Sequence, residues 1–433
     1  MAETSIVRAI KGMNDVRPGA EERFLDSDVW QRMFEVASRV LGGYGYDQVY
    51  LPVVEATPLF ARGIGEATDI VSKEMYTFSD RGERSLTLRP EGTAGAVRAY
   101  VEHNLGRTDP MQRWWYAGPM FRAERPQKGR YRQFFQIGAE LFGAADPSAD
   151  AEMLQLVWRL CDELGLRDVT MRINTLGDDE SRRAYRERLR GYFHAHAEAL
   201  CESCRERIET NPLRILDCKR PSCREVTAGA PDIFEVLSPA SRGHFDEVCK
   251  LLGELGVPYG RDRQLVRGLD YYTGTTFELT TTQLGAQDAL LGGGRYDNLV
   301  QELGGPPTPA IGFAAGVERI ALLLAEKIAR VTPDLYLIPM TGLAGPALRL
   351  ADALRREGGW RVEVDVSGQR LKQQMRRADR LGAKCALVLG EQEVASGHGK
   401  LKHLSVSSDL DVGLTPPALH LALGHVLGSK ESS

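Results

Sequence analysis

The stretch Phe121-Arg-Ala-Glu-Arg-Pro-Gln-Lys-Gly-Arg-Tyr-Arg-Gln133 is strongly basic and connects two apolar runs. The runs, around residues 113–122 and 131–142, predict a long antiparallel strand pair with this stretch as its loop. Residues 122–132 include five arginines and lysines and a single acid, Glu124. Arginine suits bidentate contacts with phosphate, and the tip of a hairpin can close over a ligand. The alternative is a solvated charged loop.

The second strand of this pair separates apolar from polar side chains. Its odd positions are apolar, and its even positions are Gln136, Gly138 and Glu140. Because successive strand residues face opposite sides, Gln136 and Glu140 project the same way, roughly 13 Å apart. Gly138 between them is expected to leave space above the sheet. This pattern favours a small-molecule site, and the alternative is an exposed polar face.

Three further clusters combine glycine with arginine. Arg267-Gly-Leu-Asp-Tyr-Tyr-Thr-Gly274 places Asp270 near an arginine and two tyrosines, which indicates the polar wall of a pocket. The triple glycine in Leu291–Asp297 is a weak signal, because it is also typical of a turn. In Gly312–Arg319 an arginine begins an otherwise apolar helix, and a buried arginine requires an anionic partner. That partner is either a phosphate or a local carboxylate.

The composition of the whole chain limits the class of protein. Its 433 residues suggest about three domains, at roughly 150 residues each. With 42% hydrophobic and 26% charged residues, it resembles a globular protein and not a disordered one. The formal charge of −4 excludes a strong global attraction for nucleic acid, so any such contact requires a local basic patch.

Targeting signals are not evident in the sequence. No segment approaches the roughly 20 uninterrupted apolar residues of a membrane span. The start, Met1-Ala-Glu-Thr, lacks a basic region followed by an apolar core, so we expect no signal peptide and no membrane contact. Seven cysteines, an odd number in a long chain, argue against a secreted disulfide framework. We therefore expect a cytoplasmic protein.

The chain divides into two regions, residues 1–330 and 331–433. The first strong helix is expected at about 21–41, and residues from about 175 to 258 are polar, helical and typical of an insertion. After residue 331, strands are predicted at 335–339, 361–366 and 385–389, alternating with helices at 345–357 and 368–382. Such alternation predicts a small α/β domain with a largely parallel sheet.

Four of the cysteines form two close pairs, Cys201-x2-Cys204 and Cys218-x4-Cys223, separated by thirteen residues. This spacing is typical of a tetrahedral zinc site. The alternative is four free thiols in a helical insertion. Cys161, Cys249 and Cys385 fall in regular helix or strand patterns and are expected in the core.

A basic stripe is predicted in the last region. Ser367 is expected to cap a helix on which Lys372, Arg376, Arg380 and Lys384 recur at four-residue steps. Leu371, Met375, Ala378 and Leu381 form its expected buried side. The stripe is either an RNA contact or a solvated face.

Together these clusters resemble the class II aminoacyl-tRNA synthetases, and specifically the histidyl-tRNA synthetase family, over the whole chain. The segments that carry the resemblance are Lys11-Gly-Met-Asn-Asp15, Gly45-Tyr46 with Pro52 (motif 1), Phe121–Arg125 (motif 2), Gly312–Arg319 (motif 3), Arg89-Pro-Glu-Gly-Thr93 and Arg267-Gly-Leu-Asp-Tyr-Tyr272. The last is the most specific, since many class II enzymes share motifs 1 to 3.

The resemblance implies an α+β catalytic domain, an antiparallel sheet flanked by helices, at residues 1–330. It also implies a helical insertion at about 175–258, a C-terminal α/β anticodon-binding domain at 331–433, and a homodimer. The implied reaction joins L-histidine and ATP, with Mg²⁺, to histidyl-adenylate and then transfers histidine to the 3′ end of tRNA(His). A structural Zn²⁺ would not take part in this chemistry.

The resemblance also implies roles for individual residues. Arg122 would hold the α-phosphate and the histidine carboxylate, Arg130 and Arg319 would bind ATP, and Arg267 would neutralise the transition state. Glu91, Thr93 and Gln136 would bind the amino group of histidine. Glu140 and Tyr272 would recognise the imidazole, and Tyr271 would also bind histidine. The tRNA contacts would be Arg125 and Gln127 at the acceptor end and Lys372, Arg376 and Arg380 at the anticodon.

Two other functions are alternatives to this one. A paralogue of this catalytic domain is a regulatory subunit of ATP phosphoribosyltransferase, which senses histidine without catalysis. It lacks the C-terminal domain and the reactive arginines, whereas this sequence has Arg122, Arg267 and Arg319. An RNA-binding module without catalysis would leave these arginines and Glu140 unexplained.

Overall fold

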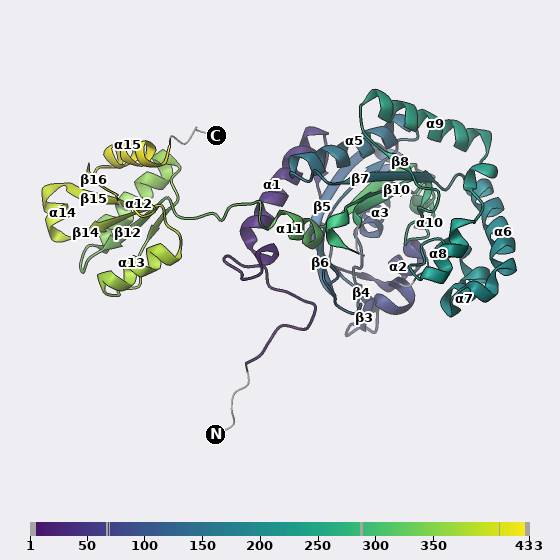
Figure 1. Cartoon of the computed structure of the whole chain (residues 1–433), viewed down its shortest axis with the longest axis horizontal. Helices are drawn as coiled ribbons and strands as arrows, with labels where there is room; N and C mark the ends of the chain where they lie inside the picture. The colour runs from purple at the N-terminus through teal and green to yellow at the C-terminus, as the bar shows by residue number, and fades with distance from the viewer. Residues whose placement is uncertain (1–5, 66–67, 69, 286–288, 407, 429–433) are drawn as a thin grey trace, which may run out of the picture. The chain divides into compact units, whose positions relative to one another are not determined.

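The computed structural model describes residues 6–65, 68, 70–285, 289–406 and 408–428 (Figure 1). It comprises two compact units, Met1–Ile328 and Ala329–Ser433, each of which is described by itself.

An eight-stranded sheet forms the centre of the first unit, with the strand order β1-β5-β6-β11-β10-β9-β7-β8. The strands are β1 (Asp47–Gln48), β5 (Gln112–Phe121), β6 (Gln133–Phe142), β7 (Thr170–Thr175), β8 (Gly260–Arg261), β9 (Thr273–Thr280), β10 (Ala289–Arg295) and β11 (Ala310–Gly316). The six inner strands are antiparallel, as expected. The expectation was wrong at the two edges, where β1 and β8 pair in parallel with their neighbours. Each of these edge strands is only two residues long.

The predicted strand pair around the basic loop is confirmed. β5 and β6 pair in register from Gln112 with Phe142 to Phe121 with Gln133. The apolar side chains of β6 pack in one large core, with the helices α1 (Ser27–Gly43), α5 (Pro147–Glu163) and α11 (Val317–Leu324) over this face. The polar side of β6 therefore faces the opposite side of the sheet.

The first helix begins later than the sequence pattern indicates. α1 starts at Ser27, because the carboxylate of Asp26 accepts a hydrogen bond from the N–H of Asp28 at 3.2 Å and caps the helix. Asp26 is fully buried and forms an ion pair with Arg23 at 2.5 Å. The turn before this cap, Arg23–Leu25, is 3₁₀-helical. Its apolar residues extend the helical pattern of the sequence beyond the true start of α1.

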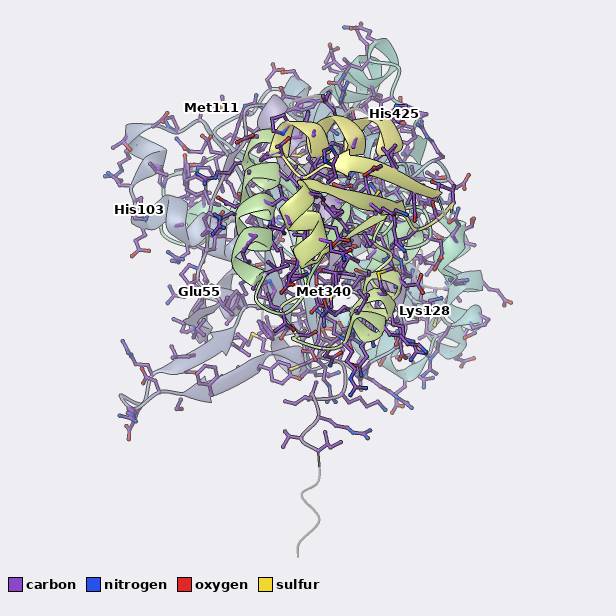
Figure 2. The ribbon with its side chains drawn as sticks, turned by 90° about the vertical axis from the view of Figure 1, so that its left-hand side faces the viewer. Glu55, His103, Met111, Lys128, Met340 and His425 are labelled. Atoms are coloured by element: carbon purple, nitrogen blue, oxygen red, sulfur yellow. The ribbon has the colours of Figure 1, made fainter. Side chains whose placement is uncertain are left out.

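The helix α3 (Thr93–Glu102) packs against the opposite face of the large sheet, and a smaller sheet and further helices accompany it. The small sheet has the order β2-β4-β3, with β2 (Val54–Ala56), β3 (Tyr76–Ser79) and β4 (Ser85–Leu88). Figure 2 labels Glu55 on β2 and, on the loop between β5 and β6, the exposed Lys128. The accompanying helices are α2 (Thr57–Ile64), α4 (Leu105–Thr108) and α10 (Leu299–Glu302).

The residues between β7 and β8 contain helices and no strands in the structure. They are α6 (Asp179–Ala195), α7 (Glu202–Thr210), α8 (Pro221–Ala228) and α9 (Pro239–Glu254), with 3₁₀ turns such as Pro212–Ile215 between them. Figure 1 shows these teal helices gathered along one side of the unit. Their buried side chains, including Cys204 and Cys223, pack with side chains of β5 and β6 and with Tyr271 in a second core.

The second unit has a five-stranded sheet with the order β13-β12-β14-β15-β16. Its elements are β12 (Leu335–Pro339), α12 (Ala344–Gly358), β13 (Val362–Val364), α13 (Leu371–Arg380), β14 (Cys385–Leu389), α14 (Glu391–Ser396), β15 (His398–His403), β16 (Ser408–Gly413) and α15 (Pro416–Leu427). The predicted strands and helices up to residue 389 are present. The sheet is parallel across β12, β13 and β14, and the antiparallel pair β15–β16 extends it.

Two local expectations in this unit were wrong. Ser367 does not cap α13, because its hydroxyl donates to Asp365 at 2.5 Å and the helix is preceded by Arg370. Leu371 is 39% exposed, since it lies in the first turn beyond the core. No helix among the described residues is both long and apolar enough to cross a membrane.

Candidate active site

The floor of a cavity is formed by small residues aligned across the large sheet. Gly138 on β6 is paired with Ala314 on β11, which is paired with Gly292 on β10. Glu278 on β9 continues this row, and Tyr116 on β5 begins it. Because three neighbouring positions carry at most a methyl group, the larger side chains at both ends can lean over the floor.

Larger side chains occupy the space above the two glycines of the floor. A Cβ atom at Gly292 would lie 2.4–2.6 Å from the guanidinium atoms of Arg267, and one at Gly138 would lie 2.5 Å from the Tyr116 hydroxyl. The prediction of empty space above Gly138 was therefore wrong, since the ring of Tyr116 occupies this space. Glycine is required at both positions by close approach and not by backbone conformation.

Four arginines converge on the cavity from three different segments. Arg122 and Arg130 come from the β5–β6 loop, Arg267 from the loop before β9, and Arg319 from the first turn of α11. Arg130 pairs with Glu124 at 2.9 Å, and Arg267 pairs with Glu278 at 2.6 Å. The cavity is thus lined with guanidinium groups that a polyanionic ligand would bind.

The pKa values of Arg122 and Arg319 are both lowered. Burial, and then the positive charges of Arg130 and Arg122, lower the pKa of Arg319. Burial likewise lowers the pKa of Arg122 despite nearby carboxylates. Arg319 donates to the carbonyl oxygens of Ala289 at 2.7 Å and Gly129 at 3.1 Å. An anion bound here would relieve the mutual repulsion of these arginines.

The pKa of Arg267 is shifted in the opposite direction. Burial acts to lower its pKa, but the opposing influence of Tyr272 and Glu278 is greater, and the pKa is raised. Its Nε–H is buried and has no hydrogen-bond partner among the described residues. A buried donor without a partner costs free energy, so this N–H is available to a ligand oxygen.

The N-terminus of α3 supplies a second group of polar side chains. Both carboxylate oxygens of Glu91 accept backbone hydrogen bonds, from Thr93 at 2.7 Å and Ala94 at 2.8 Å. Glu91 thus caps the helix as well as lining the cavity. Burial raises its pKa, and these hydrogen bonds act against the rise.

Gln136 on β6 has a buried acceptor atom without a partner among the described residues, whereas Arg267 has a buried donor without one. The Gln136 Oε1 is buried and accepts no hydrogen bond from the described residues. One wall of the cavity therefore offers an unused acceptor at Gln136, and another offers an unused donor at Arg267. A ligand with an ammonium group and an anionic group would satisfy both.

Glu140 is fully buried and accepts three hydroxyl hydrogen bonds. The donors are Thr93 at 2.8 Å, Tyr116 at 3.0 Å and Tyr296 at 2.5 Å. Burial raises the pKa of Glu140 to about 8, the charge of Glu91 adds to the rise, and the three hydroxyls oppose it. Tyr271 and Tyr272, at 4.7 Å between ring centroids, complete the aromatic side of the site.

The structure brings nearly all predicted small-molecule residues to one cavity. Glu140 is the exception, because it lies buried beside the cavity and not on its lining. The predicted residues that line it are Glu91, Thr93, Arg122, Arg130, Gln136, Arg267, Tyr271, Tyr272 and Arg319. Tyr116, Tyr296 and Glu278 were not predicted from the sequence, and only Tyr296 stands next to a motif that the sequence marked, the triple glycine.

The residues predicted to contact RNA lie outside this cavity. Arg125 and Gln127 are exposed and line a neighbouring groove together with Lys73. Lys372, Arg376 and Arg380 are exposed along α13 in the second unit. They are therefore accessible to a large ligand.

The four clustered cysteines come together in the helical region. Cys201 directly precedes α7 and Cys204 lies in its first turn, whereas Cys218 precedes α8 and Cys223 lies within it. Their sulfur atoms all lie within 4.8 Å of one another, and the N–H of Cys201 donates to Sγ of Cys223 at 3.3 Å. Sulfurs around zinc lie about 3.8 Å apart at a Zn–S distance of about 2.3 Å. Four thiolates at this spacing fit a tetrahedral zinc ion with small side-chain shifts.

Comparisons with known proteins cover both units. The histidyl-tRNA synthetase family profile matches residues 24–320, and the anticodon binding domain profile matches residues 334–413. A histidine–tRNA ligase of Geobacter metallireducens is 48% identical, over 96% of this chain and 99% of its own. One of Trichlorobacter lovleyi is 50% identical, over 96% and 98%. The apo histidyl-tRNA synthetase of S. aureus has a TM-score of 0.76 and 34% identity, over 97% of this chain and all of its own.

Proposed function

The chain belongs to the histidyl-tRNA synthetase family, and we propose that its arginine-lined cavity is where histidine is activated. The chain is an ATP-dependent aminoacyl-tRNA synthetase that attaches histidine to tRNA(His). In the first step a carboxylate oxygen of histidine attacks the α-phosphorus of ATP. The bond to the leaving pyrophosphate breaks, and histidyl-adenylate forms. In the second step a ribose hydroxyl at the 3′ end of the tRNA attacks the acyl carbon, and AMP leaves.

The observation that carries the proposal is the pair of unsatisfied polar atoms in one cavity. The free acceptor at Gln136 Oε1 suits an ammonium group, and the free donor at Arg267 Nε suits an oxyanion. Histidine and ATP together present these groups. The reaction needs little covalent chemistry from the protein, because aligned reactants and fixed positive charge lower the barrier to displacement at phosphorus.

The arginines divide this task by their positions. Arg122 and Arg267 would hold the α-phosphate from opposite sides, and Arg319 with Arg130 would bind the distal phosphates. The ammonium group of histidine would bind to Gln136, with Glu91 and Thr93 beside it. The imidazole would be recognised by Glu140 and Tyr272, with Tyr271 alongside. The family resemblance and the lining of the cavity support these assignments.

Magnesium is proposed as the ion that accompanies ATP. Mg²⁺ prefers carboxylate and phosphate oxygens, and the cavity wall includes the carboxylates of Glu124 and Glu278 beside two of the arginines. When bound, the ion would neutralise phosphate charge. The protein itself would orient the nucleophile and exclude competing water.

The second unit is proposed to bind the anticodon region of tRNA(His). Its match to an anticodon-binding family supports this, and the exposed Lys372, Arg376 and Arg380 would contact phosphates. Arg125 and Gln127 would contact the acceptor end.

A homodimer in the cytoplasm is also proposed. β1 is a short edge strand, and the nearby Tyr50 is 83% exposed, as a self-association surface would require. The tRNA substrate and the free thiols are consistent with a reducing, cytoplasmic location. Light scattering of the purified protein tests the dimer.

Zinc at the four cysteines would be structural. A cluster of four thiols with a backbone N–H directed at one sulfur supports it. Elemental analysis of protein purified without chelator should give one zinc per chain. A stoichiometry near zero would leave the cysteines as free thiols.

Histidine-dependent ATP–pyrophosphate exchange tests the proposed function. Only histidine, among the standard amino acids, should support exchange. Histidine binding without exchange would contradict the proposal and favour a histidine-sensing regulatory protein.

A further inference from the structure

The loop that carries Arg267 has no regular secondary structure. Residues 262–272 contain only turns and bends, yet the arginine at residue 267 must be held to within fractions of an ångström for catalysis. Its position therefore depends on contacts from neighbouring elements.

Three side chains from the helical region hold this loop. Arg182 on α6 donates to the carbonyl of Tyr272 at 2.6 Å, and Asn211 donates to the carboxylate of Asp270 at 2.9 Å. Arg214 donates to the carbonyl of Arg267 itself at 3.2 Å. The loop is thus fixed from its middle, at Arg267, to its end, at Tyr272, by residues that do not line the cavity.

Two of these three residues lie between the two cysteine pairs. Asn211 directly follows α7, which begins after Cys201, and Arg214 lies in the 3₁₀ turn Pro212–Ile215. The carbonyl of this turn's last residue accepts the N–H of Cys218 at 3.0 Å. The two cysteine pairs therefore flank residues 205–217, and the middle of this segment contacts the loop that carries Arg267.

The same segment is anchored by apolar packing. Leu213, Ile215 and Leu216 are buried in the core that contains Cys204, Cys223 and the two tyrosines after Asp270. Asn211 is itself 94% buried. A shift of the segment would therefore move both its polar contacts and the packing under Tyr271.

We propose that the four-cysteine site is a zinc clamp that positions catalytic Arg267, with Asn211 and Arg214 as the positioning residues that connect the two. The proposal rests on the proposed role of Arg267 in histidine activation. A structural zinc ion contributes folding free energy to the short segment that binds it. Here that segment contacts an active-site loop.

Alanine variants of the positioning residues test the connection. Asn211→Ala and Arg214→Ala should each lower the kcat of pyrophosphate exchange by roughly 10- to 100-fold, because small misplacements of a catalytic group have effects of this size. The KM for histidine and the melting temperature should change little. Arg205→Ala, an exposed arginine on the same segment, is the matched control and should retain wild-type kcat.

A double-variant experiment separates positioning from general damage. In an Arg267→Ala background, Arg214→Ala should reduce exchange by less than about twofold, since residues that act through one group are non-additive. An undiminished loss in that background, or wild-type kcat in both single variants, would overturn the proposal. Little effect of Arg267→Ala alone would instead overturn the proposed role of Arg267 and, with it, the clamp.

The metal is tested on the full-length protein without substitution. Removal of zinc, followed by assay in excess Mg²⁺, should lower kcat by a similar factor, and added Zn²⁺ should restore it. Replacement with Co²⁺ should give the absorption of tetrahedral thiolate coordination, a readout independent of activity. Exchange that is unaffected by zinc removal, or the absence of a cobalt–thiolate band, would overturn the clamp.

Discussion

The hydroxyl of Tyr296 donates a hydrogen bond of 2.5 Å to Oε2 of Glu140, from a residue 156 positions later in the chain. With Thr93 and Tyr116 it surrounds one carboxylate with three hydroxyl groups. These partners fix the orientation of the carboxyl group, which is proposed to accept an imidazole N–H of the substrate.

Replacing Glu140 should affect histidine selection more than ATP binding. Glu140→Gln keeps the size of the side chain and replaces one acceptor oxygen with an NH₂ donor, so the KM for histidine should rise by roughly tenfold or more while the KM for ATP stays within about twofold. Steady-state exchange with each substrate varied in turn measures both. Unchanged histidine KM and unchanged discrimination against other amino acids would exclude Glu140 as a specificity contact.

The same variant should alter how stability depends on pH. Burial raises the pKa of Glu140 to about 8, whereas glutamate in an unfolded chain titrates at about 4.3. The folded protein therefore retains a proton that the unfolded chain releases, and this stability, present at low pH, is lost as pH rises towards 8. The melting temperature of Glu140→Gln minus that of wild type should rise between pH 5 and pH 8.

Thermal melts at constant ionic strength measure this difference. Glu318, whose pKa burial raises to about 7, titrates in both proteins and cancels in the comparison. A difference that does not vary with pH would contradict the raised pKa of Glu140.

Adding one methyl group to the floor should displace Arg267. A Cβ atom at Gly292 would lie 2.4 Å from Nη1 of Arg267, and a flexible side chain yields more readily than the sheet. Gly292→Ala should therefore lower exchange by roughly 10²-fold with only a small change in melting temperature. Gly243→Ala, in α9 with no atom within 4 Å of the new methyl group, is the control. Equal activity of the two variants would show that Arg267 does not need this space.

The sequence predicted those parts of the fold and site that depend on local pattern. The alternation of residues 135–141 correctly predicted β6 and its apolar face. The predicted resemblance to the histidyl-tRNA synthetase family is confirmed. The ring of Tyr116 above Gly138 could not be predicted, because it requires the register of β5 against β6. The same holds for Tyr296 and Glu140, which meet through two intervening strand pairings.

Other features lacked a local signal altogether. β15 and β16 are largely polar, with Lys400, Asp409 and Asp411 exposed, so no apolar alternation marked them as strands. Ser367 resembled a helix cap, but the competing carboxylate of Asp365 binds its hydroxyl. For β15 and β16 tertiary pairing outweighed the local preference, whereas for Ser367 one local hydrogen bond replaced another.

The two units should divide the two steps of the reaction. A fragment ending near Ala329 contains every proposed residue for histidine activation and keeps the bond from Arg23 to the carbonyl of Ile328 at 2.5 Å. It should retain exchange activity and charge tRNA(His) poorly. A circular dichroism melt and light scattering must show that the fragment is folded and dimeric. A folded, dimeric fragment that charges tRNA as well as the whole chain would contradict anticodon binding by residues 331–433.

Charge reversal on α13 tests the same division in the intact chain. Lys372→Glu, Arg376→Glu and Arg380→Glu together should weaken tRNA binding and leave exchange unchanged. Each lost phosphate contact should also reduce the slope of log affinity against log salt by roughly one unit. An unchanged slope would show that the stripe is only a solvated face.

The most direct test of the central claim is the exchange rate of Arg267→Ala beside that of Arg205→Ala. Loss of one transition-state charge contact typically costs about 10²–10³ in rate. Arg267→Ala should therefore lose histidine-dependent ATP–pyrophosphate exchange by about that factor and stay folded, while Arg205→Ala should match wild type. A folded Arg267→Ala protein with near-wild-type exchange would contradict activation of histidine in this cavity.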